Sequence, residues 1–267
     1  MPVPQVLAIH DLCVFGRCSL GAAMAVLPAR GVQCCPLPLS LFPAPTIFPG
    51  VSMTDLSREM GRILNEVKGL GVRFDAIYSG YLANAGQAGL VKAAYEAFPD
   101  AFRVVDPAMA DNGKLYRSID PALVGAMKEL AGGAHLITPN VTEAAILLGK
   151  PPESAPSDES EALEWVKALS ENGRSVVLTG GGGDGITVGW SGKDGFGVFW
   201  TPRFGGSFPG SGDIFASYLL SELLHASPLG EAVQAAARFV GECAAETVRR
   251  GAEPREGLLF ETVLRRG

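Results

Sequence analysis

The chain has 267 residues, 47% of them hydrophobic, and its 22 basic and 28 acidic side chains give a net charge of −6. This composition predicts one large core and a single domain over residues 1–267, and without a basic cluster it excludes nucleic acid as a partner. No apolar run is long enough for a membrane span and no charged leader begins the chain, so we expect a cytoplasmic protein with no membrane partner.

The predicted elements alternate between apolar strands and segments of helical spacing. The first half predicts, in chain order, a strand at 5–10, a helix at 20–30, a strand at 32–39, a helix at 55–68, a strand at 74–79 and a helix at 87–98. The second half continues with a strand at 102–105, a helix at 121–130, a strand at 135–138, helices at 141–148 and 161–170, and a strand at 175–179. The last elements are a hairpin of strands at 186–190 and 195–200, and helices at 213–225 and 229–249.

This alternation predicts an α/β fold with a mainly parallel central sheet that helices cover on both faces. In such a sheet, ligands bind at the carboxyl ends of the strands. Polar residues that directly follow the predicted strands are therefore the first candidates for a functional site.

Residues 208–213, Phe-Pro-Gly-Ser-Gly-Asp, precede the apolar run 214–220 and predict a glycine-rich turn that opens a helix. The first N–H groups of a helix lack partners within it and the helix dipole adds positive charge, so this junction predicts an anion site. The carboxylate of Asp213 could accept a proton from a substrate hydroxyl held against the same amides. A structural helix cap is the alternative for the motif alone, whereas a hydroxyl activated beside a phosphoryl group indicates a kinase.

Three further clusters follow predicted strands, and they contain Asp106, Asp111, Asn140, Glu143 and Thr179. All three could face one crevice, where carboxylates and an amide suit a Mg²⁺ ion that is bound mostly through water and nucleotide phosphates. Each residue also has a structural alternative. These are a turn for Asp106 and Asp111, a capping box for Asn140 with Glu143, and a backbone-bonded hydroxyl for Thr179.

The end of the first predicted strand carries two more candidates. Asp11 could bind a ring hydroxyl or an amine of a substrate, or it could be a solvated loop acid. His10 could contact the substrate, or it could be a structural histidine whose hydrogen bonds are satisfied within the protein. The sequence leaves both pairs of alternatives open.

Three ordered motifs together carry a resemblance to a known family. Residues 104–116 (Val-Val-Asp-Pro-Ala-Met-Ala-Asp-Asn-Gly-Lys-Leu-Tyr), 138–143 (Thr-Pro-Asn-Val-Thr-Glu) and 210–213 (Gly-Ser-Gly-Asp) resemble the signatures of the pyridoxal kinases, in the ribokinase-like superfamily. The resemblance implies a three-layer sandwich with a central sheet between helices, a small lid over about residues 36–50, and a homodimer. It also implies an ATP-dependent kinase that uses Mg²⁺, with a monovalent cation left open as a further cofactor.

The resemblance assigns roles to individual residues. It makes Asp213 the base that deprotonates the hydroxymethyl group of the substrate, while three amides hold the transferring phosphoryl group, those of Gly210, Ser211 and Gly212. The implied metal ligands are Asp106 and Glu143. The residues implied on the nucleotide side are Asp111, Asn140, Glu143 and Thr179. The expected substrate contacts are Asp11, Thr46 and Tyr81.

The chain departs from the family pattern at the substrate end. Members usually carry a small polar residue such as serine in the first loop, where this chain has Ala-Ile-His-Asp at residues 8–11. They also carry Thr-His-Thr or Asn-His-Thr in the lid, where Pro45 replaces the histidine and only Thr46 is retained. Pyridoxal, pyridoxine or pyridoxamine is the leading substrate expectation. The alternatives are a hydroxymethylpyrimidine kinase, a sugar or nucleoside kinase, and a non-catalytic binding protein.

Overall fold

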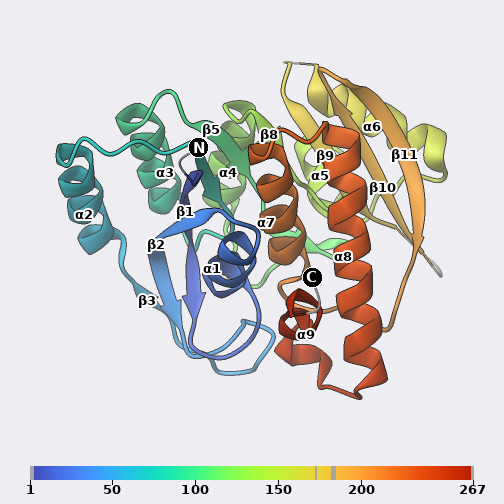
Figure 1. The fold of residues 1–267 in the computed structure, drawn as a ribbon. Coiled ribbons are helices and arrows are strands. Elements are labelled where there is room, and N and C mark those ends of the chain that lie inside the picture. Colours follow the sequence, from blue (N-terminus) through green and yellow to red (C-terminus); the bar gives the residue numbers. More distant parts are fainter. Residues whose placement is uncertain (1–2, 172, 182–184, 266–267) are drawn as a thin grey trace.

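The computed structural model describes residues 3–171, 173–181 and 185–265 (Figure 1). Within these ranges, nine strands form one sheet in the order β11-β10-β9-β8-β5-β4-β1-β2-β3. Its members are β1 (Gln5–Cys13), β2 (Gln33–Phe42), β3 (Thr54–Asp55), β4 (Ala76–Ser79), β5 (Phe102–Val105), β8 (Leu136–Ile137), β9 (Ser175–Gly180), β10 (Gly185–Gly192) and β11 (Gly195–Pro202). A separate hairpin pairs β6 (Ala110–Asp111) with β7 (Lys114–Leu115).

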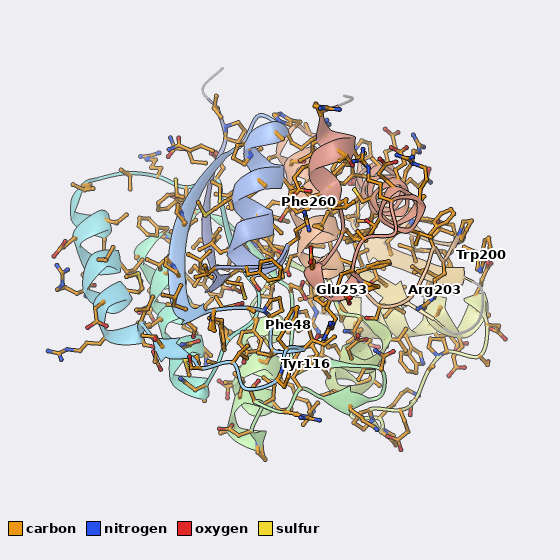
Figure 2. The ribbon with its side chains drawn as sticks, turned by 90° about the horizontal axis from the view of Figure 1, so that it is seen from below. Phe48, Tyr116, Trp200, Arg203, Glu253 and Phe260 are labelled. Atoms are coloured by element: carbon orange, nitrogen blue, oxygen red, sulfur yellow. The ribbon has the colours of Figure 1, made fainter. Side chains whose placement is uncertain are left out.

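The central strands run parallel, from β2 through β1, β4, β5 and β8 to β9. β3 at one edge and β10 and β11 at the other are added in antiparallel pairings. The carboxyl ends of the parallel strands share the lower edge of the sheet in Figure 1, which Figure 2 views from below with Phe48, Tyr116 and Arg203 labelled. The helix α7 (Ser211–Leu224) also begins at this edge.

Helices cover both faces of the sheet, as Figure 1 shows. On one face lie α2 (Ser57–Gly69), α3 (Ala85–Ala97), α4 (Pro121–Gly132), α5 (Val141–Leu147) and α6 (Glu159–Ser170), and on the other lie α1 (Ser19–Ala29), α7 and α8 (Leu229–Arg249). The short helices η1 (Pro254–Glu256) and α9 (Phe260–Leu264) end the described chain. Strand side chains alternate between the faces, so that in β1 Leu7 and Ile9 join the first core and Val6 and Ala8 join the second. The predicted three-layer α/β fold is thereby confirmed.

Several boundaries differ from the predictions. β1 continues to Cys13 and β2 to Phe42, because the two strands stay paired beyond residues 10 and 39. Prolines inside β2 are tolerated because its outer side pairs only with the two residues of β3, so few backbone N–H groups are needed there. The helix expected at 55–68 begins at Ser57, because residues 54–55 form β3 instead.

The segment predicted as a lid, residues 36–50, is in part a strand. Residues 36–42 belong to β2, and residues 43–53 link β2 to β3 without regular secondary structure. The hairpin β6–β7 was not predicted, although the sequence indicated a turn at its tip, where Asn112 and Gly113 have φ values of 52° and 75°. None of the helices in the described ranges combines the length and the hydropathy that a membrane span needs.

Candidate active site

Helix α7 begins with a turn that requires glycine. Gly210 precedes the helix with φ 81° and ψ −1°, in the left-handed region. A Cβ at Gly210 would overlap the carbonyl oxygen of Arg17. The amide of Ser211 donates to the carbonyl oxygen of Phe208 at 3.2 Å, so a phosphoryl oxygen would have to share this predicted anion-binding amide.

Asp213 stands in the first turn of α7 and is held by a second helix. Its Oδ2 accepts a hydrogen bond of 2.7 Å from the backbone N–H of Ser19, the first residue of α1. The positive ends of both helix dipoles therefore lie at this carboxylate. Burial raises the pKa of Asp213 to about 7, while the Ser19 bond opposes this increase and the charge of Asp11 adds to it. A carboxylate with a pKa near neutrality is suited to accept a proton from a substrate.

Asp106 directly follows β5, and its carboxylate lies beside the first turn of α7. Its backbone N–H donates to the carbonyl oxygen of Ser79 at 2.9 Å. Its Oδ2 stands 3.5 Å from the position that a Cβ on Gly212 would take. Burial, and then the charge of Asp213, raise the pKa of Asp106 well above its ordinary value. The base and the strand-end acid are therefore close enough to repel each other.

Asn140 and Glu143 form the capping box that the sequence offered as their structural role. The Oδ1 of Asn140 accepts from the amide of Glu143 at 3.0 Å, and the Oε2 of Glu143 accepts from the amide of Asn140 at 2.9 Å. Glu143 Oε1 also accepts from the Met109 amide at 3.1 Å. Burial and the charge of Asp106 raise the pKa of Glu143, so the capping residue also lies near the strand-end acid.

The fit of this acid pair to a metal can be judged from its donors. Asp106 and Glu143 offer buried carboxylate oxygens, which are the ligands that Mg²⁺ prefers. Among the described residues, no group of three or more His, Cys, Asp or Glu side chains could hold a metal ion by itself. The donor set therefore fits an ion such as Mg²⁺, which takes most of its ligands from water and phosphates.

Asp106→Asn should stabilise the ligand-free protein. A carboxyl group whose pKa is raised by folding loses its stabilising contribution as the pH rises through its folded pKa, and Asp106 and Asp213 both have raised pKa values. The variant should therefore have a higher Tm than the wild type at pH 8, by roughly 2–4 °C for each kcal/mol regained. The difference should shrink at pH 5, where Asp213 is protonated.

Thermal unfolding at the two pH values measures this effect, with Asp100→Asn as the control because Asp100 is exposed. A Tm of the Asp106→Asn protein at or below that of the wild type at pH 8 would contradict the repulsion.

The residues predicted to contact the nucleotide also lie at the carboxyl-end edge of the sheet. Asn140 forms a parallel bridge with Thr179 at the end of β9, and its Nδ2 donates at 2.7 Å to the carbonyl oxygen of the residue before Asp111. Burial raises the pKa of Asp111, and the nearby charge of Arg203 opposes this increase. Arg203 itself donates to the carbonyl oxygen of Gly181 at 2.7 Å. Arg203 was not predicted as a site residue, and its only signal in the sequence was a cation close before the Gly-Ser-Gly-Asp turn.

Asp11 lies inside β1 and is only 4% exposed, so its interpretation as a solvated loop acid was wrong. Its Oδ2 accepts a weak hydrogen bond from Cys13 Sγ at 3.5 Å, and its Oδ1 has no partner among the described residues. Burial raises the pKa of Asp11 to about 6, and the nearby side chains of Ser19 and Cys13 oppose this increase. An unpaired carboxylate oxygen in this position suits a substrate group that donates a hydrogen bond.

Tyr81 lies on the same side of the site as Asp11. Its hydroxyl shares a hydrogen bond of 2.8 Å with Ser118, and its ring packs edge-on against Phe42 with the ring centroids 6.0 Å apart. Burial raises the pKa of Tyr81, and the charge of Asp11 contributes to the increase, which indicates that the two groups are close. The structure therefore brings these two predicted substrate contacts together.

Thr46 is not part of this group. It is exposed in the link 43–53. The preceding residue, Pro45, is buried and packs against Gly16, where a Cβ would come within 2.7 Å of the proline ring. The segment predicted as a lid therefore contacts the rest of the protein through Pro45, at the position where the family pattern has a histidine.

Two residues near the site were missed by the sequence analysis. Ser19 acts through its backbone N–H, which every residue except proline has, so no sequence signal could have identified it. Tyr116 belongs to the 104–116 motif, which was the available signal. Burial and the charges of several site carboxylates, beginning with that of Glu143, raise its pKa, and Figure 2 shows it at the lower face of the protein.

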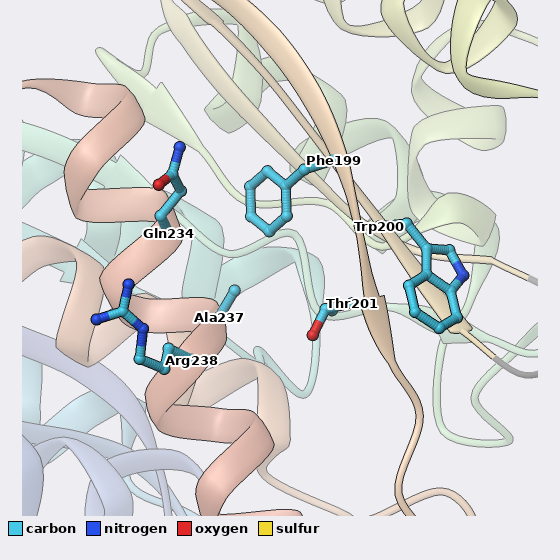
Figure 3. Close-up of a pocket in the computed structure, with 6 residues that line it drawn as sticks. All are labelled: Phe199, Trp200, Thr201, Gln234, Ala237 and Arg238. Atoms are coloured by element: carbon cyan, nitrogen blue, oxygen red, sulfur yellow. The ribbon is translucent and has the colours of Figure 1, made fainter.

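A cavity of about 430 Å³ lies between β11 and α8. Its lining residues are Phe199, Trp200, Thr201, Gln234, Ala237 and Arg238 (Figure 3). The ring of Phe199 extends toward α8, whereas the ring of Trp200 extends away from that helix. None of the predicted site residues lines this cavity.

Residues 62–256 match the family described as phosphomethylpyrimidine kinase. This match spans well over half of the 267-residue chain.

Two solved structures are similar to the chain over nearly its whole length. The first is a protein from Bacteroides thetaiotaomicron, provisionally named a phosphomethylpyrimidine kinase and crystallised with pyridoxal. It is 35% identical to this chain, with a TM-score of 0.93 over 99% of this chain and 96% of that one. Pyridoxal kinase from Lactobacillus plantarum is 28% identical, with a TM-score of 0.89 over 99% of this chain and 96% of that one.

Among curated proteins, the thiamine biosynthesis bifunctional protein ThiED of Geobacter sulfurreducens is 33% identical over 172 residues, which are 62% of this chain and 34% of that protein. The bifunctional enzyme TH1 of Arabidopsis thaliana is 29% identical over 89% of this chain and 46% of its own length. The chain thus spans between a third and a half of the length of these two relatives.

Proposed function

Because the chain belongs to the phosphomethylpyrimidine kinase family, among kinases related to both pyridoxal and hydroxymethylpyrimidine kinases, we propose that it transfers the terminal phosphoryl group of ATP to a hydroxymethyl group on a small heteroaromatic ring. The observation that carries this proposal is the placement of Asp213. Its carboxylate stands at the N-termini of two helices, beside Asp106, and has a pKa near neutrality. A base beside the N-terminal amides of a helix can deprotonate an alcohol while the amides stabilise a phosphoryl group.

In the proposed reaction, Asp213 takes the proton of the substrate hydroxyl on Oδ1, since Oδ2 is held by the Ser19 amide. The amides at the start of α7 hold the phosphoryl oxygens, and Gly210 allows the turn that presents these amides beside the loop before α1. Positioning and charge stabilisation are most of what phosphoryl transfer requires.

Asp106 and Glu143 are the proposed Mg²⁺ ligands, directly or through water. The ion would neutralise charge on the nucleotide phosphates. Asn140 and Thr179 meet at the end of β9 and are the proposed nucleotide contacts, together with Asp111. Asn140 already forms a capping box at the start of α5. Its proposed role is therefore to stabilise the start of this helix as well as to contact the phosphates.

A vitamin B6 form is the proposed ring substrate. The 35% identical Bacteroides protein was crystallised with pyridoxal, and the unpaired Oδ1 of Asp11 next to Tyr81 suits a ring that donates a hydrogen bond. Hydroxymethylpyrimidine is the second candidate, because the matched family is described as phosphomethylpyrimidine kinase and a curated relative from Aquifex aeolicus is named a hydroxymethylpyrimidine/phosphomethylpyrimidine kinase. An aminopyrimidine also donates from its amine.

Phosphorylation assays with pyridoxal, pyridoxine, pyridoxamine and hydroxymethylpyrimidine, each with ATP and Mg²⁺, test the proposal. We expect a phosphorylated product from at least one B6 form, with a higher kcat/KM than for the pyrimidine. ATP binding without a product from any ring would reject catalysis and favour a non-catalytic binding protein.

Pro45→His should raise kcat/KM for pyridoxal about fivefold. One recovered hydrogen bond from the lid to the ring is worth about 1 kcal/mol, which is a factor of about five. The control is Pro43→His, an exposed proline in the same link. Equal activity of both variants and the wild type would show that this pocket recognises its ring without a lid histidine.

A further inference from the structure

His10 is completely buried within β1, beside Asp213. Its Nδ1 lies 3.9 Å from Oδ1 of Asp213, the oxygen that is not held by the Ser19 amide. The His10 ring packs edge-on against Tyr78, with ring centroids 4.3 Å apart, and this contact fixes the plane of the imidazole. His10 is thus the side chain directly beside the proposed base.

The neighbouring strand leaves room for this imidazole. A Cβ on Gly80, just after β4, would overlap Nδ1 of His10, so the ring occupies a space that only glycine provides. Burial lowers the pKa of His10 to about 3, against the opposing effect of the Tyr78 backbone, so the imidazole is neutral at physiological pH. A neutral imidazole has one N–H donor and one acceptor nitrogen.

The hydrogen bonding of His10 differs from that of a structural histidine. Neither ring nitrogen makes a hydrogen bond of ordinary geometry among the described residues, although the side chain is fully buried; the backbone of Tyr78 lies close enough to oppose the fall in its pKa. A buried polar group without a partner costs about 1–3 kcal/mol, so such groups in native proteins call for an explanation. The nearest charged acceptor is the one at 3.9 Å on Asp213. A histidine satisfied within the protein would depend on the Tyr78 backbone alone.

We propose that His10 is a positioning residue for the proposed base: its neutral imidazole carries hydrogen on Nδ1 and donates it to Oδ1 of Asp213 when the carboxylate turns toward the substrate hydroxyl. A shift of about 1 Å brings the two atoms to hydrogen-bond distance. Oδ1 keeps a second lone pair for the proton of the hydroxyl. With Ser19 on Oδ2 and His10 on Oδ1, both oxygens of the base are oriented by the protein. This role rests on the proposed kinase reaction.

Two near-isosteric variants separate the two ring nitrogens. His10→Asn places an amide nitrogen near the position of Nδ1, and His10→Gln places one near the position of Nε2. We expect His10→Gln to lower kcat about tenfold or more with little change in KM for ATP, because orientation of the base acts on the chemical step. His10→Asn should keep kcat within about threefold of the wild type. Equal losses in both variants, or no loss in either, would overturn the proposal.

The tautomer gives a second readout that does not depend on activity. In ¹⁵N NMR spectra of the ligand-free protein, the resonances of His10 can be assigned by their absence in His10→Asn. We expect hydrogen on Nδ1 in the wild type, with a shift of this resonance in Asp213→Asn. Hydrogen on Nε2 would overturn the proposal even in an active enzyme. Absence of kinase activity with every ring, together with an Nδ1–H tautomer that responds to Asp213, would reject the proposed function and leave the contact supported.

Discussion

Asp213→Asn should lower kcat by roughly 100-fold or more while the protein still folds and binds ATP. Asparagine keeps the size of the side chain, and its carbonyl oxygen can still accept the hydrogen bond from the Ser19 amide. It cannot accept a proton from the substrate hydroxyl. The variant therefore removes the base and retains the geometry that surrounds it. Steady-state kinetics with the ring that the wild type prefers measures this loss.

Two controls accompany Asp213→Asn. The Kd for ATP should stay within about threefold of the wild-type value, because the proposed nucleotide contacts lie on other residues. The Tm should not fall, since burial raises the pKa of Asp213 and a neutral amide relieves that unfavourable charge. Full turnover by the variant would show that another group takes the proton, and the proposed mechanism would then have to be abandoned.

Most of the fold could be predicted from the sequence because buried strands and amphipathic helices leave regular hydrophobic patterns. The predicted alternation of strands and helices, the mainly parallel sheet and the predicted hairpin, which is β10–β11, are all present. The errors fall where pairing partners decide the outcome. β2 continues over residues 40–42 because its neighbour β1 continues beside it, and Asp55 joins the edge of the sheet although the spacing from residue 55 suggested a helix. Such tertiary pairing leaves no local signal.

The residues of the site whose side chains are proposed to act chemically could be predicted from the sequence. Asp213 and Asp106, which are far apart in sequence, lie close together, as the shared edge of a parallel sheet requires. The orienting groups were harder to predict. The Ser19 contact uses a backbone amide, and the place of His10 depends on a missing Cβ at Gly80, just after β4. Thr46 is exposed, and its predicted contact with the substrate stays a prediction.

Gly210→Ala should abolish the activity, with kcat at least about 100-fold lower, and should lower the Tm. The left-handed backbone at φ 81° costs alanine about 1–2 kcal/mol, and its Cβ would in addition overlap backbone atoms of Arg17 and Cys18, which have no freedom to move aside. The turn would have to open, and the amides and Asp213 would move with it. Circular dichroism melts and kinetics of the same preparation measure both effects.

Gly206→Ala is the matched control, because it lies in the same loop and a Cβ there would meet nothing within 4 Å. It should keep the Tm and kcat of the wild type. If Gly210→Ala has a Tm only slightly below that of the wild type but no turnover, the loss of activity comes from the changed geometry of the anion site. If the Tm and kcat of Gly210→Ala equal those of Gly206→Ala, the turn does not depend on glycine. Gly210 packs against the backbone of the loop before α1. This single glycine therefore sets the distance between the N-termini of α1 and α7, which together hold Asp213.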